Sequence, residues 1–401
     1  MKNLIRGVAL LLPLTLLLWG CEKENDQNGE GNNHTTQVEP DTLDCRTITT
    51  PTTLSNRGQG VDYLVPCEID VEAPLTIEPG VTLAFEQGAS LYINRAGSRE
   101  GALIAEGTEQ DSITFTGVLG LPGSWVGLDL NSGSIQNKLS HCIIEYAGAG
   151  KGDEPALLVR KGSKIIIEHC TFRDNNYRGL QVAPNTLLEG FQQNSFLRND
   201  DYPIRVPASQ VTYLDAATRF ADNALSEIYV QNGSIYDRGY VRGSGHEWTA
   251  LSIPYFVDQD LNVTGQLTIA KGCQISFSND KWLNVEDNGA ILKVEGTRLQ
   301  KVSITGRAGK GSWNGIYIAS SSPENIIEYA TIADGGQNKK GWYMNNSANI
   351  SVGYLDNPDR IIISETTIRN SAGCGIVKEP GAIVSRSKIT YEENSSGNFC
   401  Q

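Results

Sequence analysis

The chain repeats itself at long range, and this repetition limits its possible folds more than any other feature. Residues Gly123–Leu128 (Gly-Ser-Trp-Val-Gly-Leu) return 188 positions later as Gly311–Ile316 (Gly-Ser-Trp-Asn-Gly-Ile). Two further segments return in the same order: Leu75–Phe85 as Leu267–Phe277, and Leu103–Phe115 as Leu292–Ile304. Self-similarity of this kind is the signature of repeat architectures. The sequence therefore predicts a stacked array in which each unit buries its apolar face against the next.

Within each repeat, apolar residues are spaced for short β-strands. Leu75 and Ile77 stand two positions apart, as do Leu83 and Phe85, so each pair can point to one face of a strand. Glycine is abundant at 42 residues and methionine is scarce at 2. Turn dipeptides such as Pro79-Gly80 separate the apolar pairs. This pattern is typical of many short strands joined by tight turns.

A second recurring pattern places two apolar residues five positions apart. It occurs at Leu139–Ile144, Ile167–Phe172, Ile327–Ile332, Ile363–Ile368 and Val384–Ile389. Residues five apart on a flat strand point to opposite faces, so both can face inward only if a bulge or sharp bend lies between them. We interpret the pattern as the corner of a coil in a parallel β-helix. One position within it is held by Cys142, Cys170, Ala330, Thr366 and Ser387, which predicts an inward ladder of small residues.

These segments resemble the right-handed parallel β-helix of the pectin-lyase-like superfamily, and more closely the β-helix lipoproteins of Gram-negative bacteria. The resemblance rests on Thr76–Val81, Glu106–Thr108, Gly123–Gly127 and Asn325–Ile332, with their partners in the other half. It implies an all-β chain with one continuous right-handed solenoid over residues 51–401, built from two similar multi-coil halves at about 61–205 and 251–400. The resemblance does not indicate a function, because this fold occurs in lyases, hydrolases, esterases and binding proteins.

Residues 1–20 have the layout of a bacterial export signal. Lys2 and Arg6 precede the apolar run Val8–Leu18, which is too short to span a membrane comfortably. Leu18-Trp19-Gly20-Cys21 resembles the lipobox of bacterial lipoproteins, which implies that Cys21 is acylated. The alternative is an ordinary signal peptide followed by a structural cysteine. Residues 21–50 are polar and acidic with almost nothing to bury, so we expect a flexible tether there.

The charge of the chain narrows its possible partners. The formal net charge is −13, and removal of residues 1–20 takes two basic residues and no acid, which leaves −15. An acidic surface repels nucleic acid and polyuronates unless cations bridge them. We therefore expect no nucleic-acid partner, and contact with a membrane only through the lipid anchor. Together with the lipobox, this predicts an outer-membrane lipoprotein at the cell surface.

No catalytic constellation is visible in the sequence. Similarity to β-helix polygalacturonases is limited to one pair of acids, Asp200-Asp201, which we interpret as a polar turn because the other motifs of those enzymes are missing. The candidate lyase bases Arg173 and Arg369 hold equivalent repeat positions, which favours a structural role. His141 and His169 show no metal-ligand spacing. We predict no catalytic residue, no metal and no cofactor, with calcium needed only if the protein is a lyase.

Four cysteines are placed to staple the ends of the solenoid. Cys45 with Cys67, and Cys374 with Cys400, are the pairings we predict. Each end coil exposes a face that no neighbour covers, and a disulfide there would constrain it. An exported protein meets an oxidising compartment in which such bonds persist.

Aromatic residues outside the repeat are the candidates for binding. Trp342 and Tyr343 lie in an insertion between matched coils, Gly335–Asn349, and Tyr354 follows it, whereas Trp125 and Trp313 belong to the repeat and are predicted to pack. The alternative is a loop folded over its own hydrophobic side chains. We predict a lipid-anchored surface protein that binds a polysaccharide or another surface partner without catalysis. A polysaccharide lyase or glycoside hydrolase with a site assembled across coils, and a structural or adhesive protein, remain open.

Overall fold

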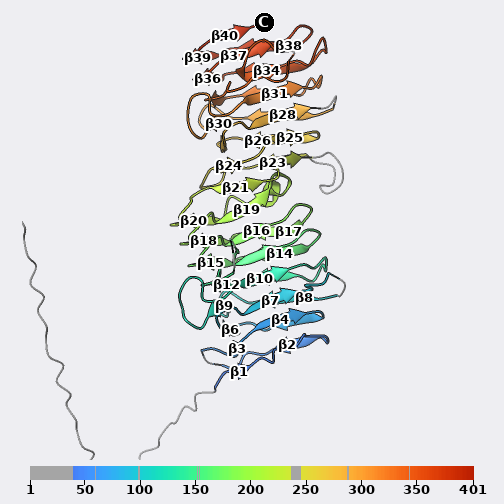
Figure 1. Ribbon diagram of the computed structural model, residues 1–401, viewed down its shortest axis with the longest axis vertical. Coiled ribbons are helices and arrows are strands. Elements are labelled where there is room, and N and C mark those ends of the chain that lie inside the picture. The colour runs from blue at the N-terminus through green and yellow to red at the C-terminus, as the bar shows by residue number, and fades with distance from the viewer. Residues whose placement is uncertain are drawn as a thin grey trace, which may run out of the picture. The chain divides into compact units, whose positions relative to one another are not determined.

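The computed structural model describes residues 39–401 except 59, 98–99, 151, 153, 236–244, 287–288 and 343. The expected signal peptide, Cys21 and residues 21–38 of the tether lie outside the described residues. The compact unit, residues 38–401, is an all-β parallel β-helix whose coils stack one on the next (Figure 1). The first coil already includes Asp41, which pairs with Tyr63, so the solenoid begins before residue 51.

The described strands form five parallel sheets, numbered here 1 to 5. Sheet 1 holds β1 (Asp41–Thr42), β3 (Tyr63–Val65), β6 (Thr82–Phe85), β9 (Ile113–Gly117), β12 (Cys142–Glu145), β15 (Thr171–Arg173), β18 (Ser195–Leu197) and β20 (Arg219–Ala221). Sheet 3 holds β2 (Thr52–Leu54), β5 (Pro74–Ile77), β8 (Ala102–Glu106), β11 (Lys138–Ser140), β14 (Lys164–Glu168) and β17 (Leu187–Gln192). The short helix η1 (Ala208–Tyr213) follows β19 and contacts β17.

Sheet 2 runs through both halves of the molecule. It holds β4 (Glu68–Val71), β7 (Ser90–Ile93), β10 (Gly127–Leu130), β13 (Leu157–Val159), β16 (Leu180–Val182), β19 (Ile204–Pro207), β21 (Ile228–Gln231), β24 (Tyr255–Val257), β27 (Gln274–Phe277), β30 (Val302–Gly306), β33 (Ala330–Ala333), β36 (Thr367–Arg369) and β39 (Thr390–Glu392).

Sheets 4 and 5 belong to the second half. Sheet 4 holds β22 (Ser234–Ile235), β25 (Leu261–Val263), β28 (Trp282–Glu286), β31 (Gly315–Ala319), β34 (Ala348–Val352), β37 (Cys374–Lys378) and β40 (Gly397–Cys400). Sheet 5 holds β23 (His246–Trp248), β26 (Gln266–Ala270), β29 (Ile291–Glu295), β32 (Ile326–Glu328), β35 (Arg360–Ser364) and β38 (Ile383–Ser387).

The expected bends at the coil corners are present and have a backbone cause. Between the two apolar residues of each pattern stands a residue in the left-handed region: His141, His169, Tyr329 and Glu365 have φ of 48°, 54°, 47° and 50°. The bend turns the chain sharply, so that apolar residues on both sides of it face inward. In the last coil the structure moves the predicted ladder position by two residues. Ser387 pairs with Ser364 and lies before the bend at Lys388, so Ile389 takes the ladder position.

One continuous core fills the solenoid, and the repeat tryptophans are part of it. Trp125 stacks on Phe85 at 4.1 Å between ring centroids, and Trp313 stacks on Phe277 at 4.6 Å. Each indole Nε1–H donates a 2.8 Å hydrogen bond to a backbone carbonyl twenty residues on, that of Glu145 or Ala333. Both rings are fully buried, which confirms the predicted packing role. A buried indole keeps its free energy low only when its N–H finds such a partner.

The two halves are not in phase around the solenoid axis. β6 lies in sheet 1, but its repeat counterpart β27 lies in sheet 2. In the same way β10 lies in sheet 2 and its counterpart β31 in sheet 4. The second half is therefore displaced by one sheet, and sheet 2 carries the change where β21 pairs with β24. The coils at this junction follow neither repeat.

Both cysteine pairs singled out in the sequence are disulfide-bonded. Cys45 is joined to Cys67 with 5.9 Å between their Cα atoms, and Cys374 to Cys400 with 6.3 Å. The first bond ties the opening segment to the turn before β4, and the second ties β37 to the last strand, β40. Among the described residues, three further cysteines are free and buried, namely Cys142, Cys170 and Cys273.

Candidate functional site

The structure does not gather the predicted binding aromatics into one place. Trp342 and Tyr354 lie at opposite ends of β34, one before the strand and one after it, and are 85% and 44% exposed. Tyr343 lies outside the described residues. The side chains of Lys340 and Met344 turn back onto Trp282 and Tyr317 of sheet 4. The insertion therefore covers aromatic side chains of sheet 4, whereas its own Trp342 stays exposed.

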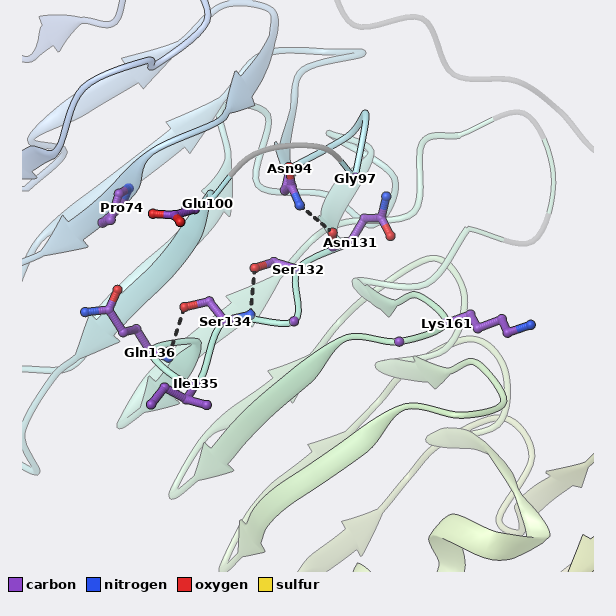
Figure 2. Close-up of a pocket in the computed structure, with 12 residues that line it drawn as sticks. Pro74, Asn94, Gly97, Glu100, Asn131, Ser132, Ser134, Ile135, Gln136 and Lys161 are labelled. Carbon is purple, nitrogen blue, oxygen red and sulfur yellow. Dashed lines mark hydrogen bonds between the residues drawn. The ribbon is translucent and has the colours of Figure 1, made fainter. Parts of the chain in front are cut away.

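A surface cavity of about 680 Å³ lies where the turns after β7 and β10 approach each other. Figure 2 shows Asn94, Asn131, Ser132 and Ser134 around it, joined by hydrogen bonds within and between the turns. Ser132 Oγ also donates to the carbonyl oxygen of Gly101. These polar groups hold the turns in place.

A smaller cavity of about 490 Å³ lies on the outer face of sheet 2, at the junction between the halves. Its lining residues are Tyr177, Arg178, Asp200, Asp201, Tyr202, Arg205 and Tyr229. Side chains that point outward on neighbouring strands form a row here, because Gln181 pairs with Arg205, Arg205 with Tyr229, and Tyr229 with Phe256. We call the lining residues, together with Gln181, Phe256, Glu227, Asp258 and Arg307, the junction site.

Two ion pairs frame the junction site. The Arg178 guanidinium donates from Nε and Nη2 to Asp201 Oδ2, at 2.9 and 2.6 Å, and both side chains are largely buried. The Arg307 guanidinium contacts Glu227 Oε2 at 2.9 Å. Charge-assisted bonds of this kind fix the geometry of the side chains that make them.

Three aromatic rings form the floor between these pairs. The ring of Tyr229 meets Tyr202 edge-on at 5.0 Å and Phe256 edge-on at 5.7 Å, while Tyr202 and Phe256 are nearly parallel at 6.2 Å. The Arg307 guanidinium lies 4.0 Å from the centroid of Phe256. Edge-to-face and offset arrangements are the preferred geometries for aromatic pairs.

Arg205 is the residue of the junction site whose hydrogen-bonding capacity is unfilled. Its guanidinium lies 5.0 Å from the Tyr229 centroid, and its buried Nε has no hydrogen-bond partner. Within the described part of the chain no carboxylate forms an ion pair with Arg205. A buried donor without an acceptor costs about 1–3 kcal/mol. Because Nε is buried, an acceptor from outside the chain could reach Arg205 only through its terminal Nη groups.

Tyr229 is held in its neutral form. Burial raises the pKa of its phenol to about 12, and the hydrogen bond from its hydroxyl to Asp258 Oδ2, at 2.7 Å, acts in the same direction. At neutral pH the side chain is therefore an aromatic ring with a fixed hydroxyl and is poorly suited to act as a base. Tyr202 and Tyr229 are partly exposed, whereas Phe256 is buried beneath Arg307, so the two tyrosines are the rings that a ligand could contact.

The sequence did not predict the junction site, although it drew attention to two residues that line it, Asp200 and Asp201. Asn199-Asp200-Asp201 was expected to be a polar turn, and Asn199 does serve the fold, since it accepts a hydrogen bond from Asn175 and donates one to Asn223, both at 2.8 Å. Asp201 instead enters the site. The available signal was position: Tyr229 falls between the two repeat halves, and Tyr202 and Phe256 lie at the ends of the halves that face each other.

The other candidates from the sequence have structural surroundings. Arg173 forms an ion pair with Glu145 at 2.7 Å. His141 and His169 stack at 4.6 Å between centroids, one coil apart. Over the described residues no three His, Cys, Asp or Glu side chains are grouped to hold a metal ion. The helices found within the same residues are too short or too polar to cross a bilayer.

Comparisons with known proteins add little to this geometry. No protein-family model and no curated protein matches the chain. The solved structures include a match to the crystal structure of a TibC-catalysed, hyper-glycosylated fragment of TibA, residues 55–350. The two chains are 11% identical, and the match covers 89% of this chain and 99% of that fragment, with a TM-score of 0.18. A TM-score this low carries no argument about this chain.

Proposed function

We propose that the protein is a lipid-anchored, cell-surface β-helix that binds a glycan at the junction site without cleaving it. The observation that carries the proposal is the partly exposed guanidinium of Arg205, which forms no ion pair within the described residues, beside the partly exposed rings of Tyr202 and Tyr229. Aromatic faces stack on the apolar faces of sugar rings, and a guanidinium donates to sugar oxygens. These residues occur once in a chain that otherwise repeats, which favours a role beyond packing.

The proposed location rests on the export signal expected at residues 1–20, with the lipobox-like segment that ends at Cys21, and on the two disulfides. Cys21 follows a lipobox-like segment and would be the acylated residue. The two disulfides are of the kind that persists in oxidising, extracytoplasmic compartments. Labelling with a radioactive fatty acid, abolished in Cys21→Ser, is the direct test of the anchor.

A glycoside hydrolase or lyase is the second candidate, because Asp200, Asp201 and Arg178 meet in one cavity. Binding without cleavage is favoured by the state of these groups. Asp201 is engaged by two donors of Arg178, and Tyr229 is held protonated. A hydrolase needs two carboxyl groups free to act on opposite sides of a glycosidic bond.

The test uses residues 38–401, which form one compact unit. Plant, algal and host polysaccharides are cast into native gels with and without calcium, and the same samples are assayed for new reducing or unsaturated ends. We expect retardation by at least one polysaccharide and no new ends. Tyr229→Ala should weaken that retention about tenfold, which corresponds to about 1.4 kcal/mol.

Trp342→Ala is the matched control, because it removes an exposed aromatic outside the junction site. It should leave retention unchanged. New reducing or unsaturated ends would replace the proposal with the hydrolase or lyase. Retention that survives Tyr229→Ala and fails in Trp342→Ala would move the glycan to the insertion. Absence of retention on every polysaccharide would favour an adhesive protein with a protein partner.

A further inference from the structure

A second set of polar and aromatic side chains is hidden on the outer face of sheet 4. Trp282, Asn284 and Glu286 alternate along β28 with the inward-facing Leu283 and Val285. Outward residues of a solenoid normally face water, yet Trp282 is 8% exposed and Asn284 4%. They are covered by residues 335–342, which we call the strap, and by Met344.

The strap places an ammonium group in the centre of this set. Lys340 Nζ forms an ion pair with Glu286 Oε1 at 2.7 Å and donates to Asn284 Oδ1 at 2.8 Å. It also lies 5.2 Å from the ring centroid of Trp282 and 4.7 Å from that of Tyr317. Two aromatic faces, a carboxylate and an amide oxygen are the groups that recognise a cation. We call these four residues the ammonium box.

One group beside the box is not satisfied by the strap. Ser351 pairs with Tyr317 across β31 and β34, and its Oγ is buried without a hydrogen-bond partner. Lys340 occupies the cation position but forms no hydrogen bond with this hydroxyl. A ligand with both an amine and hydroxyl groups would match the surface better than a lysine side chain does.

We propose that the ammonium box is a second glycan site, specific for amino sugars that carry a free amine, and that Lys340 occupies it as an internal competitor. The acidic chain, at −13, attracts a cationic glycan and repels an anionic one. The box lies on sheet 4 and the junction site on sheet 2, so this proposal stands or falls independently of the function proposed above.

The first residues of the strap are fixed by backbone hydrogen bonds, such as that from the Gly336 N–H to the Asn314 carbonyl at 3.2 Å, so we place the movement that frees the box in residues 338–342. Asn338 Nδ2 donates to Asn314 Oδ1 at 2.9 Å and to Asp280 Oδ1 at 3.0 Å. The side chain of Gln337 accepts from the Asp280 amide at 3.0 Å. Such exposed hydrogen bonds contribute about 0.5–1.5 kcal/mol each.

The test measures binding of a glucosamine hexamer and of its N-acetylated counterpart to the full chain, by calorimetry and tryptophan fluorescence. Lys340→Ala should bind the free-amine oligomer about tenfold more tightly than the unaltered protein, because the competing ammonium is gone. The acetylated oligomer has no cation and should not gain. Adding Glu286→Gln to Lys340→Ala should abolish the gain.

Two further variants separate the proposal from loss of structure and from the junction site. Asn338→Ala loosens the strap without touching the box and should also raise affinity for the free-amine oligomer. Tyr229→Ala in the Lys340→Ala background should leave that affinity unchanged. The proposal is overturned if neither Lys340→Ala nor Asn338→Ala binds the amine form better than the acetylated form, or if Tyr229→Ala removes the gain.

Discussion

At the scale of single residues, the junction site combines two ion-paired cations, Arg178 and Arg307, with a third, Arg205, that forms no ion pair within the described residues. Arg178 is 7% exposed and its charge is balanced by Asp201, whereas Arg205 has only a ring face and an unfilled Nε. A buried charge that loses its partner becomes costly, because neither water nor another carboxylate replaces it. The ion pair therefore holds the edge of the site, and Arg205 is left available for a ligand.

This difference predicts the effect of removing a carboxylate. Asp201→Ala leaves the Arg178 guanidinium buried without its carboxylate and should lower the free energy of unfolding by about 3 kcal/mol. Glu324→Ala is the control, because it breaks an ion pair of equal length to Lys293 in which Glu324 is 54% exposed, and it should cost less than about 1 kcal/mol. Urea unfolding monitored by circular dichroism measures both. Equal effects would contradict the buried role assigned to Asp201.

At the scale of elements, each half relies on one tryptophan to close the corner after its repeated Gly-Ser segment. Trp125 and Trp313 stack on a phenylalanine and donate to a carbonyl in the same way, although their strands lie in different sheets. The local sequence thus builds the same corner in two different surroundings. This is expected when contacts within a coil and with its next neighbours decide the structure.

Truncation of these rings should be severe and local. Trp313→Ala removes a fully buried ring and leaves a cavity, which should cost about 3–5 kcal/mol. Trp342→Ala removes a ring that is 85% exposed and should change stability by less than about 0.5 kcal/mol. Denaturant midpoints of the two variants give the comparison. A small effect of Trp313→Ala would mean that the coil closes without its corner ring.

At the scale of the whole molecule, the shift between the halves leaves the junction weakly paired. Sheets 1 and 3 end before it, sheets 4 and 5 begin at it, and among the described strands only sheet 2 continues across, through β21 and β24. In a solenoid each coil is stabilised by its neighbours alone. A boundary crossed by one sheet separates two blocks that can open independently.

Hydrogen exchange should reveal these two blocks. Phe172→Ala, a core truncation in the first half, should speed exchange of the amides in residues 61–205 and leave residues 261–378 nearly unchanged. Ile350→Ala is its counterpart in the second half and should do the reverse. Native-state exchange followed by mass spectrometry resolves the segments. Uniform acceleration along the whole solenoid would show a single cooperative unit instead.

The sequence alone was sufficient for the coils, the corners and the pairing of Cys45 with Cys67 and of Cys374 with Cys400. These features depend on short-range patterns: alternation within a strand, a bend between apolar residues five apart, and cysteines at each end. The last-coil error at Ser387 arose because β38 pairs with one neighbouring strand and is mostly exposed, so apolar spacing there is a weak guide.

Only the tertiary structure decided where the candidate site lies. Arg178, Arg205, Tyr229 and Arg307 are far apart in the chain, and they meet because coil register at the junction is set by how two differently phased halves join. The insertion that drew attention to Trp342 instead directs Lys340 onto Trp282 and Tyr317. Repetition can be read from a sequence because it is local, whereas contacts between outward side chains of neighbouring coils depend on the length and path of every loop between them.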